Sequence, residues 1–178
     1  VAVSAIGTGP AGGTAAPVVP AGSPFVTTQS AVIVSPTSAQ LRGSVTANGA
    51  SASNSFRYST NSDMSSPTTV GASPATASGT AATSAIASSL QPGTTYYFQA
   101  AAANAVGTTY GSTMSFVTPA SPPAVTTTAA TSVTGTSAVV NANVTANGAA
   151  TTTNFSISTS NSFLAGTVVV QGSPTPVN

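Results

Sequence analysis

The stretch that decides the fold has the sequence Leu90-Gln91-Pro92-Gly93-Thr94-Thr95-Tyr96-Tyr97-Phe98-Gln99. A Pro-Gly turn leads directly into a segment whose side chains alternate between two faces, which is the periodicity of a β-strand. Tyr96 and Phe98 belong to one face, and Tyr97 and Gln99 to the other. Three of the ten aromatic residues (four Tyr and six Phe) lie here, so we expect the core to form around this strand.

Further strands are expected on both sides of this stretch. A second alternating run after Gly107 should complete a central hairpin, with Tyr110, Met114 and Phe116 on one face. Earlier in the chain, strands are predicted at 25–34, 39–46, 54–60, 68–71 and 84–90, with an Asn-Gly turn at 48–49. Seven strands in roughly 95 residues are typical of an immunoglobulin-like sandwich. The predicted class is therefore all-β.

Alternation also predicts which side chains face the core. The residues expected to point inward from these earlier strands are Leu41, Gly43, Val45, Phe56, Tyr58, Ile86 and Leu90. Arg42 and Arg57 occupy the opposite parity and should point outward.

The motif Leu90-x-Pro92-Gly93-Thr94-x-Tyr96, followed by Ala102-x-Asn104-x-x-Gly107, resembles a fibronectin type III domain. The bacterial variants of the family are the most similar, in the segments Thr37 to Leu41, Asn48-Gly49 and Thr109 to Ser112. The resemblance covers residues 25–118 and implies that Tyr96 is the corner tyrosine, whose hydroxyl binds nearby backbone. The family's core Trp is absent, so Leu41 or Phe56 must fill its volume. The family hosts many binding and spacer roles, so the resemblance is informative about fold rather than function.

The chain then repeats itself at an offset of 136 − 37 = 99 residues, because 37–50 aligns with 136–149. At that offset Phe56 matches Phe155, Tyr58 matches Ile157 and Met64 matches Phe163. We therefore predict a sandwich at 25–119 and, after a Pro-rich linker, a partial second sandwich at 120–178. Counterparts of 84–117 would fall at 183–216, so the inner-face residues Val140, Val144, Phe155 and Ile157 are expected to lack a covering layer.

Residues 1–24 are predicted to form an extended arm, which is a candidate donor strand. Short alternation at the start and a Pro-Val-Val-Pro segment favour an extended backbone, although a flexible linker is the alternative. The residues expected to contact another subunit are Val1, Val3, Ile6, Val18 and Val19.

Charge is almost absent: the charged side chains are Arg42, Arg57 and Asp63, and the chain has no Lys, Glu, His or Cys. General acid–base and nucleophilic catalysis need titratable side chains that this chain lacks. Ordinary zinc and calcium sites need His, Cys or several carboxylate ligands, which are also missing. We predict no catalytic residues, no cofactor and no metal site. A net charge of +1 offers no footprint for nucleic acid, and no apolar run is long enough for membrane insertion. The composition favours an extracellular or cell-surface location.

Two minor motifs concern partners. Arg57 could lie over the Tyr97 ring on an outward face, and the alternative is that both side chains are solvated. Tyr97 could also form, with Gln99, a patch that stacks on sugars. Asn143-Val-Thr and Asn154-Phe-Ser match the N-glycosylation acceptor pattern, at Asn143 and Asn154, although such short patterns also arise by chance.

These features predict a non-enzymatic structural subunit of an extracellular filament or cell-surface fibre. Its partners would be other copies of itself, joined head-to-tail by β-strand complementation. The alternatives are a spacer or glycan-binding fragment of a larger secreted multidomain protein, or an adhesin that uses its loop tips.

Overall fold

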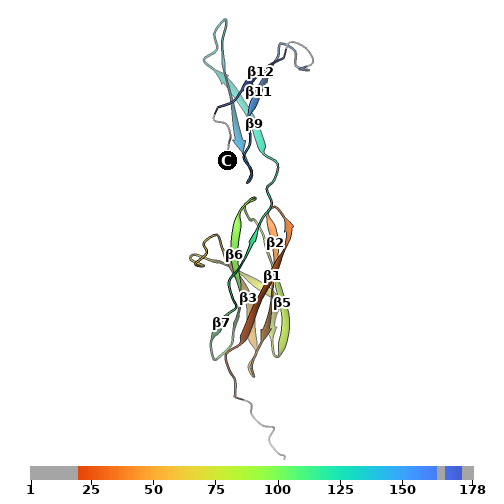
Figure 1. The fold of residues 1–178 in the computed structure, drawn as a ribbon, viewed down its shortest axis with the longest axis vertical. Helices are drawn as coiled ribbons and strands as arrows, with labels where there is room; N and C mark the ends of the chain where they lie inside the picture. Colours follow the sequence, from red (N-terminus) through yellow and green to blue (C-terminus); the bar gives the residue numbers. More distant parts are fainter. Residues whose placement is uncertain (1–19, 164–166, 174–178) are drawn as a thin grey trace, which may run out of the picture.

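Figure 1 shows the computed structural model of the chain, which describes residues 20–163 and 167–173. The described residues form twelve β-strands and no helix, so the predicted all-β class is confirmed. The first eight strands form one sheet, and the last four form two separate pairs. The arm at 1–24, with Val1, Val3, Ile6, Val18 and Val19, lies outside the described residues except for 20–24.

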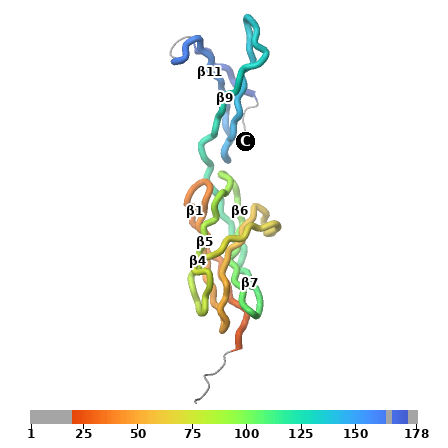
Figure 2. The backbone as a smooth tube through the Cα atoms, turned by 180° about the vertical axis from the view of Figure 1, so that it is seen from behind, coloured from red at the N-terminus to blue at the C-terminus, as the bar shows by residue number. Residues whose placement is uncertain are grey.

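The eight-stranded sheet is antiparallel throughout and has the order β1-β2-β5-β4-β3-β6-β7, with β8 also paired to β6. Its strands are β1 Phe25–Ser35, β2 Ser38–Thr46, β3 Ala52–Ser59, β4 Thr68–Ala77, β5 Thr80–Ala87, β6 Thr95–Ala103, β7 Thr108–Tyr110 and β8 Met114–Val117. Strand β4 pairs with β3 on one side and meets β5 on the other through Ser73 and Ser84. The sheet curls into a half-barrel through this strand (Figures 1 and 2).

The core lies inside the curl, around the strand that the sequence singled out. Tyr96 and Phe98 of β6 are buried whereas Tyr97 and Gln99 are partly exposed, which confirms their predicted alternation. The alanines that follow, Ala100, Ala101 and Ala102, are all buried. Leu41 and Phe56, the two residues expected to compensate for the missing Trp, have no exposed surface. Gly43 of β2 is needed for close packing, because a Cβ there would lie 2.7 Å from the Thr27 carbonyl oxygen and 2.9 Å from the Ala100 Cβ.

The Pro-Gly turn before β6 is fixed by side chains that bond to its backbone. The Tyr96 hydroxyl accepts a hydrogen bond from the Gln91 backbone N–H at 2.9 Å, so the expected bond between this hydroxyl and nearby backbone is present. The Thr118 hydroxyl donates to the Gln91 carbonyl at 2.6 Å and accepts from the Thr94 N–H at 3.0 Å. The Tyr96 ring stacks on Phe116 with centroids 5.6 Å apart.

Two predicted orientations are wrong. Ile86 is 51% exposed, because the register places Ala85 opposite Leu41 and Ile86 opposite Gln40. Tyr110 is 47% exposed and does not share the face of Phe116. The predicted second run is divided into β7 and β8, and Tyr110 pairs with Ala101 on the outer face of β6.

The second half contains two antiparallel pairs, β9 Ala124–Thr131 with β10 Val139–Thr145 and β11 Asn154–Ile157 with β12 Val168–Gln171. Its backbone repeats the first half at the predicted offset. Asn48 and Asn147 both have φ 52°, and their side-chain amides donate to the carbonyls of Ser23 (2.7 Å) and Pro122 (2.6 Å). The sequence repeat is therefore also a structural repeat in these turns.

Candidate functional site

The first candidate site is an open groove of about 470 Å³ between the two strand pairs of the second half. Val125 and Val144 line it from β9 and β10, and Phe155 lines it from β11. We call it the inter-pair groove. The repeat explains its apolar lining, since Val144 and Phe155 correspond to Val45 and Phe56, which are buried in the first half.

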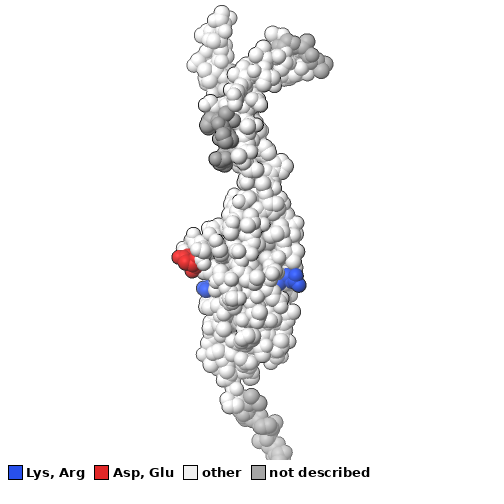
Figure 3. Space-filling view, viewed as in Figure 1, with Lys and Arg blue, Asp and Glu red and all other residues white. Residues whose placement is uncertain are grey.

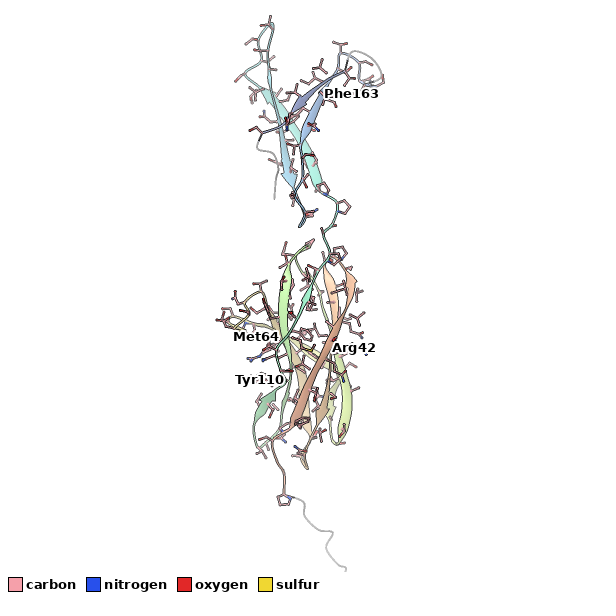
Figure 4. The ribbon with its side chains drawn as sticks, viewed as in Figure 1. Arg42, Met64, Tyr110 and Phe163 are labelled. Atoms are coloured by element: carbon pink, nitrogen blue, oxygen red, sulfur yellow. The ribbon has the colours of Figure 1, made fainter. Side chains whose placement is uncertain are left out.

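No second layer covers the predicted inner face among the described residues of the second half. Val140, Val144 and Phe155 are partly exposed, and Ile157 is 43% exposed. Ala146 is the single buried hydrophobic residue in the described part of 120–178. The other large side chains with high exposure there are Val125, Val133, Val139, Phe163, Val168, Val169 and Val170. Figure 4 labels Phe163 near the outer end of this half.

The two predicted glycosylation acceptors lie beside this groove. Asn143 on β10 and Asn154 on β11 both line it, and both side chains are exposed. The structure therefore brings together two residues that are eleven positions apart in the sequence (154 − 143).

A second notable contact joins the two halves. Gly93 of the Pro-Gly turn meets Gly148 of the second Asn-Gly turn, and a Cβ on Gly148 would lie 2.6 Å from the Gly93 Cα. Both glycines have positive φ, 62° and 88°, so a side chain at either position would be strained by conformation and would also clash with the facing glycine. Ser121 in the linker donates its N–H to the Asn147 carbonyl at 2.9 Å.

The third feature is an ordered polar and aromatic cluster on the outer face of β3, β6 and β7. The Arg57 Cζ lies 3.7 Å from the centroid of the Tyr110 ring, and Arg57 Nε donates to Gln99 Oε1 at 2.7 Å. The Gln99 amide in turn donates to the Thr113 hydroxyl at 2.8 Å. The sequence left open whether Arg57 lies over the Tyr97 ring or is solvated, and the structure instead places it over Tyr110. The sequence missed it because Tyr110 was assigned to the inner face.

Charge is sparse on the surface: Figure 3 shows one acidic patch and two basic ones on an otherwise neutral molecule. The hydroxyl and backbone N–H of Ser65 hold the pKa of Asp63 below its usual value, despite a small opposing effect of desolvation. Within the described residues, no cluster of three or more His, Cys, Asp or Glu is present to bind a metal. Those residues also form no helix of the length and apolarity needed to cross a membrane.

Comparison with known proteins gives little guidance. No protein-family model matches the chain, and no match was found among curated proteins. Among solved structures, the chain is similar to the sensor domain of the anti-sigma factor RsgI4 in Pseudobacteroides cellulosolvens. The two are 25% identical, and the match covers 54% of this chain and 94% of that chain with a TM-score of 0.42.

Proposed function

We propose that the protein is a non-enzymatic structural subunit of an extracellular filament, in which a strand from one copy completes the open second half of another. In this subunit, we further propose, residues 25–119 form a fibronectin type III-like sandwich and residues 120–178 form part of a second. The strand order supports this description, since β1-β2-β5-β4 and β3-β6-β7 follow the order of the two layers in immunoglobulin-like domains.

The observation that carries the proposal is the inter-pair groove. Two-stranded pairs are marginally stable without a covering layer, and exposed strand edges invite association. Here apolar side chains from both pairs border one groove, whereas the equivalent positions Val45 and Phe56 are 1% and 0% exposed in the first half. The second half therefore gains stability when an apolar strand enters the groove.

The arm of another copy has suitable chemistry for that strand. Val1 and Val3 alternate with small residues, and Val18-Val19 lies between two prolines that favour an extended backbone. An added strand supplies main-chain hydrogen bonds, and its alternate side chains fill apolar pockets. Because the donor and acceptor surfaces differ, the contact is head-to-tail and extends into a fibre. Two Arg and one Asp in the whole chain give little repulsion between copies.

Electron microscopy of two point variants and one truncation tests this function. Phe155→Asp places a charge in the groove and should abolish fibres, as should removal of residues 1–24. Val133→Asp is the matched control, because Val133 is 69% exposed and does not line the groove. Fibres with unchanged subunit spacing in either the truncated chain or Phe155→Asp would overturn strand complementation.

A second candidate function, a spacer built of tandem sandwiches in a larger secreted protein, is favoured by a repeated junction. In the second half, the Ser121 N–H donates to the Asn147 carbonyl, at the end that lies next to the first half. In the first half, Gly22 N–H bonds the Asn48 carbonyl at 2.8 Å in the same way, 99 residues earlier. Repeated junctions orient successive units of an array. A full chain that stays monomeric at all concentrations in analytical ultracentrifugation would favour the spacer over the filament.

A further inference from the structure

We propose that the outer face of β3, β6 and β7, with the loop at 60–65, binds a neutral oligosaccharide. We call this surface the outer aromatic face and define it by Arg57, Tyr97, Gln99, Tyr110 and Thr113. It lies on the first half, away from the inter-pair groove, and does not depend on filament formation. Figure 4 shows Tyr110 and Met64, which belongs to the loop, on the same flank of the body, with Arg42 on the opposite flank.

The strand register brings these side chains to one face. Arg57 lies opposite Gln99, and Tyr110 lies opposite Ala101 on β6. Tyr97 and Gln99 are partly exposed and alternate with the buried residues Tyr96, Phe98 and Ala100 of the same strand, so they point outward. Tyr97 and Tyr110 are four strand positions apart, roughly 13 Å at the usual rise per residue. A ligand that touches both rings is therefore longer than a single sugar ring.

The polar groups of this face are already held in place. Arg57 is fixed by Gln99 at 2.7 Å and by the Tyr110 ring at 3.7 Å, and Gln99 is fixed by Thr113 at 2.8 Å. This network uses one nitrogen of the guanidinium, and its two terminal nitrogens have no hydrogen-bond partner among the described residues. Donors that are ordered before binding lose less entropy when a ligand arrives.

The loop between β3 and β4 extends this surface beside Tyr97 and stands out from the flank of the body (Figures 1 and 2). It is anchored by the buried Met64 and by the Ser59 hydroxyl, which donates to the Ser65 carbonyl at 2.8 Å. The loop and Tyr97 together line an open hollow of about 440 Å³. The residues that line it are Thr60, Asn61, Ser62, Asp63, Ser65 and Tyr97.

This combination of groups matches the chemistry of a sugar chain. A sugar ring has an apolar C–H face, which suits the partly exposed ring of Tyr97. Its hydroxyls both donate and accept, and the face offers the Arg57 guanidinium as donor, the Asp63 carboxylate as acceptor and Asn61 as both. The charges of Arg57 and Asp63 cancel, so neither a polyanion nor a polycation gains a net attraction. A neutral, hydroxyl-rich chain fits these groups best.

Isothermal titration of the full chain with cellohexaose, xylohexaose, mannohexaose and chitohexaose tests the site, with hexagalacturonate as an acidic comparison. At least one neutral hexasaccharide should bind saturably. Tyr97→Ala and Arg57→Ala should each weaken that binding by about tenfold or more, the effect of losing one favourable contact. Tyr97→Phe keeps the ring and should stay within about twofold of the parent protein. Arg42→Ala, on the opposite flank, should leave binding unchanged.

The proposal is overturned if none of the four neutral sugars binds, or if both alanine variants bind as tightly as the parent chain. Tighter binding of hexagalacturonate than of every neutral sugar would also overturn it, because the site would then recognise charge. The titration repeated in Phe155→Asp separates this site from assembly. Binding retained in that variant supports a site on the single chain, whereas binding lost there overturns it.

Discussion

Replacing Phe98 by alanine should destabilise the first half far more than the same change at the adjacent Tyr97. Phe98 is 0% exposed and packs edge-on against Phe116, with ring centroids 5.7 Å apart at 63°. Deleting a buried Phe side chain leaves a cavity and costs about 3–5 kcal/mol. Tyr97 is partly exposed on the outer face, so its truncation opens no core cavity and should cost about 1 kcal/mol or less. At a usual urea dependence, Phe98→Ala should lower the unfolding midpoint by roughly 2 M.

Tyrosine fluorescence is a selective assay for this comparison. The chain has no Trp, and its four tyrosines (Tyr58, Tyr96, Tyr97 and Tyr110) all lie in the first half. Urea unfolding followed by this signal therefore reports on β1–β8 and not on the second half. Midpoints lowered equally in Phe98→Ala and Tyr97→Ala would refute the inward and outward assignment on which both the core and the outer aromatic face depend.

Three further outcomes are expected. Tyr96→Phe should cost about 1 kcal/mol in urea unfolding, because it removes the acceptor of the Gln91 N–H; an unchanged midpoint would contradict this role. Thr83→Val should be neutral or stabilising, because the buried Thr83 hydroxyl has no partner among the described residues. Thr118→Val should cost about 1–3 kcal/mol, because it leaves part-buried backbone groups of the turn unpaired; a larger loss in Thr83→Val than in Thr118→Val would contradict these assignments. Because the folded pKa of Asp63 is lowered, its stabilising effect is present above the ordinary value of 3.8 and is lost as the pH falls through the folded pKa. Thermal melts of Asp63→Asn should lack this loss.

The sequence alone predicted the features that depend on local chemistry. The alternation of Tyr96 to Gln99 is strong because large aromatic residues mark both faces, and the preceding Pro-Gly turn sets where the strand begins. The corner hydrogen bond also followed from the sequence, through the family resemblance. The repeat at an offset of 99 predicted that Asn147-Gly148 would form the same turn as Asn48-Gly49, and the positive φ values agree. The expectation of a non-enzymatic protein rests on the lack of His, Cys, Lys and Glu in the sequence.

Only the tertiary structure decided the faces of β5 and β7. β5 has alanine at both parities, at Ala81, Ala82, Ala85 and Ala87, so its sequence gives little contrast between an inner and an outer face. Pairing with β2 settles the matter by placing Ala85 beside Leu41, which leaves Ile86 outside.

The candidate sites also depend on strand pairing that the sequence does not define. The partner of Arg57 depends on the register of β7, a three-residue strand whose own pattern is too short to define a face. The inter-pair groove depends on how β9–β10 and β11–β12 lie relative to each other. Local periodicity shows that a strand exists, but pairing with neighbours that are distant in sequence decides which of its two faces is buried.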